Sequence, residues 1–150
     1  MGSRKSAFTL IELMLVVAII SLLAAVAAPS FLEARKKSQN ARFVNDQRVI
    51  AGSFEQYAME HGQYPPDDFP GVTPAGMATY FTKVNFSGKT PMGGNWDWDE
   101  GYLAVAALST VGSTAELTQW QDVDRLIDDG NLSAGSFRQR PARFSYIIEN

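Results

Sequence analysis

FTLIELMLVVAIISLLAAVAAP, residues 8–29, is an almost unbroken run of Leu, Ile, Val, Met and Ala whose one charge is Glu12. As a helix rising about 1.5 Å per residue, this segment spans about 33 Å, enough to cross a hydrocarbon layer of about 30 Å. We therefore predict that residues 8–30 form a membrane-spanning helix.

Glu12 is costly in such a helix, because a carboxylate near the middle of a bilayer is unfavourable by about 2.5 to 3.5 kcal/mol. No Lys, Arg or His lies between Phe8 and Pro29. A partner for Glu12 must therefore come from the chain terminus, from another molecule or from interfacial water.

The residues before the apolar run, MGSRKSA, are short and basic, with Arg4 and Lys5 and no acid. An ordinary secretory signal has its small-residue cleavage site after the apolar core, whereas Ala7 precedes the core here. A cut at Ala7 leaves the helix attached to the protein.

A short basic leader, a small residue and then FTLIELMLVVAII resemble the class III leader and N-terminal helix of type IV pilins and pseudopilins. The resemblance covers Ser6 to about Ala34. It implies that a prepilin peptidase cuts between Ala7 and Phe8 and methylates the new Phe8 amine, although the family's usual residue before the cut is Gly. Glu12 then resembles the acid that pairs with the terminal amine of a neighbouring subunit, which fixes the register of assembly. The alternative is a signal anchor whose Glu12 only reaches the lipid headgroups.

The composition bounds the rest of the chain. With 150 residues and 45% hydrophobic content, it has room for one soluble domain beside the apolar segment. The formal charge of −3, more negative still without the leader, argues against nucleic-acid binding. The chain has no cysteine. Many pilins of surface fibres carry a disulfide near the C-terminus, so this absence favours the pseudopilin branch.

The helix is expected to continue beyond Pro29, with a kink where the proline amide is missing. Residues 31–61 carry apolar side chains at spacings of three and four, which predicts a helix with one face packed on a sheet. Gly62 and the following prolines end it, so the helix is roughly 54 residues, or about 80 Å, long. His61 is expected to be a capping or surface residue.

The predicted fold class is α+β, with a long N-terminal helix packed on a small C-terminal antiparallel sheet. The organisation follows from the patterns above and from the turn residues of the later chain. The expected segments are a leader (1–7), a transmembrane and filament-core half-helix (8–30) and a soluble domain (31–150). The soluble domain is divided into the second half-helix (31–61), a connecting loop (62–92) and a sheet with a short helix (93–150). The connecting loop has a short helical turn near 77–81.

The block TPMGGNWDWDEGY interleaves aromatic and acidic residues. It loosely resembles in position the turn that leads to the sheet and calcium loop of G-type pseudopilins. Asp97, Asp99 and Glu100 offer oxygen ligands for Ca2+, so they are candidate metal ligands. The alternative is plain strand alternation, with the Trp side chains inward and the acids in water. A glycosidase-like pair is disfavoured, and no other catalytic motif is present, so we expect no enzyme.

Three features are predicted near the C-terminus. Residues 102–108 and the segment with Phe144, Tyr146 and Ile148 read as antiparallel strands. Residues 113–129 read as a short helix whose stripe includes Asp124. The run 128–131, DDGN, reads first as a turn and second as an acidic ligand cluster. The arginines of the last segment form a basic patch for a neighbouring subunit or a solvated face: Arg138, Arg140 and Arg143.

The predicted function is structural: a subunit of a type II secretion pseudopilus. The resemblance implies an inner-membrane pool of monomers, with the C-terminal domain in the periplasm, that is extracted and stacked into a filament. It implies the prepilin peptidase, a platform membrane protein, an assembly ATPase, minor pseudopilins, membrane lipid and other copies of this chain as partners. The alternatives are a type IV pilin of a surface fibre for adhesion, motility or DNA uptake, and a membrane-anchored enzyme or binding module.

Overall fold

The computed structural model describes residues 8–101 and 106–149, so the leader (1–7) and Ala7 lie outside the described residues. Residue contacts divide the chain into two compact units, 1–37 and 38–150, and the long helix contributes to both. In chain order the elements are α1 (Leu10–His61), η1 (Met77–Thr79), β1 (Asn95–Glu100), β2 (Ala106–Val111), α2 (Leu117–Ile127), β3 (Phe137–Arg140) and β4 (Arg143–Glu149).

The first part of α1, up to residue 37, exposes its apolar side chains. An 18-residue window of α1 has a mean hydropathy of 2.8, and none of it is buried inside the chain. The helix is therefore long and apolar enough to cross a membrane. It is continuous through Pro29, and the kink expected there stays a prediction.

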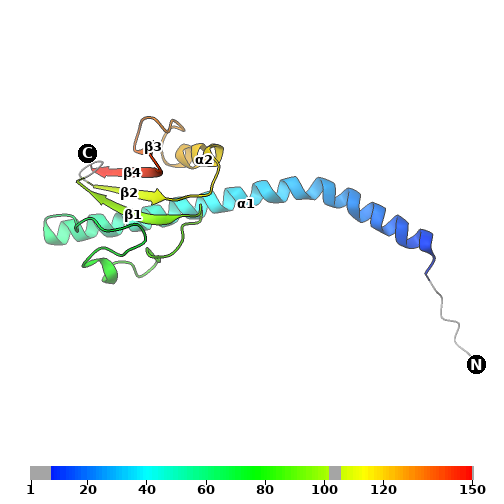
Figure 1. The fold of residues 1–150 in the computed structure, drawn as a ribbon, viewed down its shortest axis with the longest axis horizontal. Coiled ribbons are helices and arrows are strands. Elements are labelled where there is room, and N and C mark those ends of the chain that lie inside the picture. Colours follow the sequence, from blue (N-terminus) through cyan, green and yellow to red (C-terminus); the bar gives the residue numbers. More distant parts are fainter. Residues whose placement is uncertain (1–7, 102–105, 150) are drawn as a thin grey trace, which may run out of the picture. The chain divides into compact units, whose positions relative to one another are not determined.

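The second part of α1 packs against the sheet. Phe43, Ile50 and Phe54 are buried, with exposed fractions of 1% or less, and they lie seven and four residues apart on one helix face. Figure 1 shows the sheet running along this part of α1. The helix ends at His61, before Gly62 with a φ of 74°. The predicted stripe and the predicted helix end are both confirmed.

The sheet has four antiparallel strands in the order β1-β2-β4-β3. Trp96 and Trp98 of β1 face α1, where Trp96 lies 5.0 Å from Phe43 and Trp98 lies 3.7 Å from Phe54, centroid to centroid, with stacked rings. Trp120 of α2 meets Phe43 edge-on at 5.1 Å. One aromatic core therefore joins α1, β1 and α2, and the predicted α+β class is confirmed.

Several predicted boundaries shift. The strand predicted over residues 102–108 is β2, Ala106–Val111, while residues 102–105 lie outside the described residues. Asn95 begins β1 directly after Gly93 and Gly94. The helix predicted over residues 113–129 is α2, Leu117–Ile127, with Glu116 at its N-cap. The Ser113 hydroxyl, four residues before α2, donates to the Met92 carbonyl and accepts from the Ala115 amide.

The hairpin of β3 and β4 was not predicted. Its two strands are joined by only Pro141 and Ala142. Pro141 fixes a negative φ at the first turn position, and Ala142 takes a φ of 63° at the second. The short helical turn expected in the loop is confirmed as η1, Met77–Thr79.

Candidate functional site: the start of α1 and the acidic groups of the sheet domain

The start of α1 is held by a reciprocal pair of side-chain contacts. The Thr9 hydroxyl accepts the Glu12 amide at 3.3 Å. Oε2 of Glu12 in turn accepts the Thr9 amide at 2.8 Å and the Thr9 hydroxyl at 2.7 Å. This is a capping box, in which residues three apart satisfy backbone donors that the first helical turn leaves free. Glu12 therefore has a structural role in its own chain.

Within the described residues, the charge of Glu12 has no cationic partner. Among residues 8–101 and 106–149, Glu12 receives hydrogen bonds only from Thr9, which is neutral. The adjoining Phe8, whose amine is expected to be released by cleavage, is 80% exposed. The arrangement presents a fixed carboxylate beside the expected new terminus, and it can accept an amine from outside the chain.

Large apolar side chains surround this carboxylate and extend along the first half of α1. They are exposed within the isolated chain by 48% to 80%. They comprise Phe8, Leu10, Ile11, Leu13, Met14, Leu15, Val16, Val17, Ile19, Ile20, Leu22, Leu23, Val26, Phe31 and Leu32. Such a surface is stable only against lipid or against other apolar helices.

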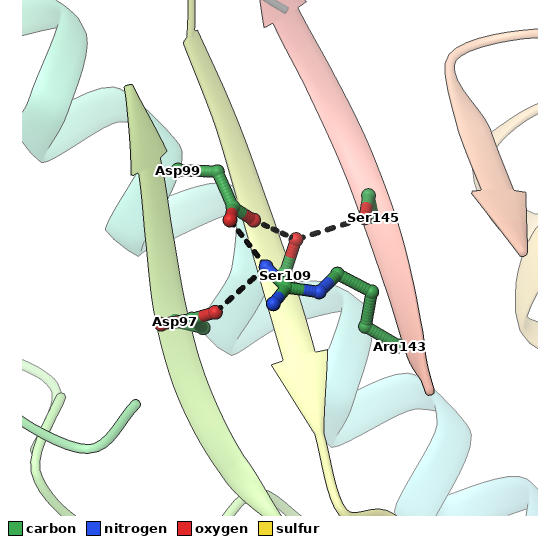
Figure 2. Close-up of polar contacts among 5 residues, drawn as sticks. All are labelled: Asp97, Asp99, Ser109, Arg143 and Ser145. Carbon is green, nitrogen blue, oxygen red and sulfur yellow. Dashed lines mark hydrogen bonds and ion pairs between the residues drawn. The ribbon is translucent and has the colours of Figure 1, made fainter. Parts of the chain in front are cut away.

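The calcium candidates on β1 are engaged by an arginine. Figure 2 shows the Arg143 side chain reaching from β4 across β2 toward β1. Nη1 of Arg143 donates to Asp97 Oδ2 at 2.9 Å and also to Asp99. The Ser109 hydroxyl donates to Asp99 and lies 2.8 Å from the Ser145 hydroxyl. A charged and polar network therefore covers the face of the sheet opposite α1.

The strand geometry explains this network. Side chains alternate along a strand, so the two Trp residues that face α1 place Asp97 and Asp99 together on the other face. Asp97 pairs with Ser109 in the register of β1 and β2, and Ser109 pairs with Ser145 in that of β2 and β4. The expectation that the acids stand in water is wrong, because Asp97 and Asp99 are each only 3% exposed.

Burial has an electrostatic consequence for Asp97. Desolvation, followed by the Asp99 charge, raises the pKa of Asp97 to about 7, although the Arg143 guanidinium acts in the opposite direction. One arginine thus serves two buried carboxylates. Glu100 is exposed at the end of β1 and does not join them, so the three candidates form no common ligand set. Calcium at these residues stays a prediction. Of the predicted basic patch, Arg143 contacts acids of its own chain.

A different acidic group lies at the end of α2. Carboxylate oxygens of Asp124, Asp128 and Asp129 all lie within 4.8 Å of one another. The sequence pattern predicts residues 128–131 first as a turn, and it puts Asp124 in an apolar stripe. An aspartate at a buried helical position, four residues before a second acid, was the signal that could have identified the group.

His61, the one histidine, behaves as predicted. Its Nδ1 lies 3.0 Å from the Tyr57 carbonyl oxygen, and its ring stacks on the Tyr57 ring at 4.1 Å. A ring held at the last turn of an exposed helix end is a capping feature.

Comparison with known proteins supports the resemblance at the N-terminus. Residues 2–28 match the family model described as the prokaryotic N-terminal methylation motif. The chain is 34% identical over 79 residues to a fimbrial protein of Neisseria meningitidis, covering 53% of this chain and 44% of the relative.

Two further relatives differ in their described roles. The type IV major pilin protein PilE of Neisseria gonorrhoeae is 34% identical over 79 residues, or 53% of this chain and 45% of the relative. The type II secretion system core protein G of Klebsiella pneumoniae is 29% identical over 62 residues, which cover 41% of this chain and 44% of the relative. The chain spans less than half the length of these relatives, and no solved structure matches it.

Proposed function

We propose that this chain is a structural subunit of a helical filament. The methylation motif, the fold and the relatives support a place in the type IV pilin and pseudopilin family. The observation that carries the proposal is the start of α1. There Glu12, which is held by Thr9 and has no cationic partner among the described residues, lies at one end of a long exposed apolar surface. A neighbouring copy offers both an amine and an apolar helix.

The proposed assembly exchanges one apolar environment for another. The monomer is stored with the first half of α1 in lipid, and that half packs among identical helices in the filament. The Phe8 amine of an incoming copy neutralises Glu12, which removes the cost of two separate charges in an apolar medium. Because the capping box fixes the Glu12 side chain, only one register of neighbouring helices brings amine and carboxylate together.

More specifically, we propose that the filament is the pseudopilus of a type II secretion-like system. The relative named core protein G and the absence of cysteine support it. Under this proposal the soluble domain lies in the periplasm, the filament grows from the inner membrane, and the prepilin peptidase, the platform protein, the assembly ATPase and minor pseudopilins are its partners.

A surface fibre is the second candidate, and the fimbrial and major pilin relatives favour it. Antibodies against the soluble domain, used in electron microscopy of cells producing the native chain, separate the two. Labelled long extracellular fibres select the surface pilus, and label confined to the cell envelope selects the pseudopilus.

Two measurements test the filament role itself. Mass spectrometry of the mature N-terminus is expected to find a methylated Phe8. Glu12→Ala is expected to abolish sedimentable filaments, while Glu33→Ala, which removes an exposed acid of the same helix beyond the apolar run, leaves them intact. A chain that keeps residues 1–7 and never polymerises, or full filament yield from Glu12→Ala, contradicts the proposal and favours a membrane-anchored enzyme or binding module.

A further inference from the structure

The connecting loop carries an exposed apolar turn before β1. Phe69 and Val72 are 79% and 44% exposed. The Val72 amide donates to the Phe69 carbonyl at 2.9 Å, with Pro70 at the second turn position and Gly71, whose φ is 81°, at the third. These residues and this hydrogen bond are typical of a type II turn. We refer to residues 69–72 as the loop knob.

Hydrogen bonds hold the loop knob against the sheet. The Gly71 amide donates to the Trp96 carbonyl of β1 at 2.7 Å, and Asp68 Oδ1 accepts the Phe69 amide at 2.8 Å. β1 is an edge strand of the sheet. Because the turn is already ordered, binding through Phe69 costs little further conformational entropy. The knob therefore presents a fixed aromatic side chain to the outside of the domain.

A notch of about 360 Å3 lies between α1, the end of α2 and β4. We refer to it as the α1–α2 notch, and its apolar walls come from Val44, Ala51, Gly52, Leu126, Ile127 and Tyr146. The helix surface is low at Gly52, since nothing lies within 4 Å of the place where a Cβ would stand. Leu126 is 55% exposed. An apolar cavity of about 150 Å3 admits benzene, so the notch has room for a phenyl side chain.

The notch also contains an acceptor that the single chain leaves unsatisfied. Gln47 lines the notch and is only 4% exposed. No hydrogen bond from the described residues reaches its buried Oε1 atom, which is unfavourable for a buried acceptor. The edge of an aromatic ring carries partial positive charge, so a phenyl ring is a better neighbour for Oε1 than an aliphatic side chain.

The loop knob and the notch lie on opposite sides of the domain. The knob is bound to β1, whereas the notch is lined by β4 and α2. β1 and β3 are the two edges of the sheet, and Trp120 of α2 stacks on Phe137 of β3 at 5.8 Å. A knob therefore cannot enter the notch of its own chain. A contact between two different surfaces is heterologous, and its repetition builds an open helical assembly when it does not close into a ring.

The charges around the two surfaces favour one orientation of this contact. Asp67 and Asp68 directly precede Phe69 in the chain. Arg48 lies exposed at the notch, and Glu55 lies there about two helical turns further along α1. A knob seated with its acids beside Arg48 gains an opposite charge, whereas the reversed seating brings them to Glu55. Such pairing fixes the register of an interface.

We propose that Phe69 of one copy of this chain inserts into the α1–α2 notch of the next copy. This inference rests on the proposed filament role and names a contact between the soluble domains. An aromatic side chain buries about 150 to 250 Å2, far less than the roughly 1,200 Å2 of a stable interface. The contact therefore acts together with the packing of the apolar half-helices and does not hold a dimer by itself.

The yield of sedimentable filaments from cells producing the full chain tests this contact. Phe69→Ala removes the ring, and Gly52→Phe fills the notch from its own chain. Each is expected to lower the yield about tenfold or more. Met59→Ala is the matched control, because Met59 is 82% exposed but lies in neither the knob nor the notch, and it is expected to leave the yield unchanged. The unfolding midpoint of Phe69→Ala is expected to match that of the native chain, which separates loss of the contact from loss of the fold.

Chemical crosslinking identifies the neighbour. The chain has no cysteine, so Val72→Cys and Glu55→Cys, combined in one chain, place one thiol in the knob and one at the notch. Bismaleimidoethane is expected to convert filaments of this double variant into a ladder of dimers, trimers and larger species, because each copy joins one neighbour through its knob and another through its notch. Either single variant is expected to give no ladder.

The results that overturn this inference differ from those that overturn the filament role. Sedimented filaments of the double variant that give no ladder, an unchanged filament yield from Phe69→Ala, or adducts with another protein in place of a ladder overturn the inference while the filament role stands. A native chain that never forms filaments overturns the filament role and this inference together.

Discussion

Large apolar side chains are exposed in residues 8–37 and mostly buried in residues 38–149, although α1 runs through both. Leu10 and Ile11 are 80% and 74% exposed, whereas Ile50 and Phe54 are fully buried. The fold of the single chain explains only the second set. The first set requires lipid or neighbouring helices, so its composition reflects surroundings outside the single chain, whereas that of the second set reflects folding.

The two regions also differ in how they hold their acids. Among the residues that the structure describes, Glu12 receives hydrogen bonds only from the neutral donors of Thr9, whereas Asp97 and Asp99 share the Arg143 guanidinium. An acid that lacks a cation at an exposed apolar surface points to a partner outside the chain. An acid paired inside the domain instead affects the stability of the fold and the pH dependence of that stability.

The largest expected effect tests this division directly. Phe54→Ala, which removes a ring stacked at 3.7 Å on Trp98, is expected to lower the free energy of unfolding by about 3 to 5 kcal/mol. Leu23→Ala, at a side chain 65% exposed in the first half of α1, is expected to leave it unchanged. Urea unfolding of the full chain in detergent, followed by tryptophan fluorescence, measures both. Equal losses from the two variants would contradict the division.

A smaller loss is expected when the arginine of the sheet network is removed. Arg143→Ala leaves two carboxylates, each 3% exposed, without their guanidinium, and is expected to cost about 2 kcal/mol. Arg42→Ala breaks only an exposed contact of 3.8 Å to Asp46 and is expected to cost at most about 0.5 kcal/mol. The same urea unfolding compares them. Matching free energies for the two variants would show that the network is as weak as a surface ion pair.

The pH dependence of stability is expected to come partly from Asp97. An unfolded aspartate titrates near pH 4, whereas the folded state holds the pKa of Asp97 at about 7. The folded state therefore binds the Asp97 proton more tightly than the unfolded state does. The contribution of this proton to the free energy of unfolding is complete below about pH 4 and is lost as the pH rises through 7. The loss is at most about 1.4 kcal/mol per pH unit.

Asp97→Asn keeps the size of the side chain and removes this titration. Its free energy of unfolding is expected to change less between pH 5 and pH 8 than that of the native chain. Urea unfolding at intervals across this range gives the comparison. A native slope in Asp97→Asn assigns the pH dependence to other groups.

Local patterns predicted the features that depend on near neighbours. The period of the buried α1 face and the turn at Gly62 gave the helix and its end, and alternation gave β4 and the inward Trp side chains. These signals operate within a few residues, so they survive in a single sequence.

Features that depend on distant pairing were not predictable in this way. Phe137–Arg140 has no apolar alternation, and β3 forms because β4 lies beside it. The contact between Arg143 and Asp97 joins residues 46 apart. The buried state of Asp124 likewise depends on how the end of α2 packs within the domain, although its place in the apolar stripe was visible in the sequence.

The smallest expected effect concerns the hairpin of β3 and β4. Ala142 holds a φ of 63°, a conformation that costs an L-residue with a side chain roughly 1 kcal/mol and that glycine adopts freely. Ala142→Gly is therefore expected to raise the free energy of unfolding by about 0.5 to 1 kcal/mol. Gly52→Ala is the reverse control, since Gly52 lies within α1 with open space where a Cβ would stand, and helix propensity predicts a similar gain. If Ala142→Gly destabilises the protein while Gly52→Ala stabilises it, the turn at Pro141 and Ala142 is not under strain, and the pairing of β3 with β4 alone sets the hairpin.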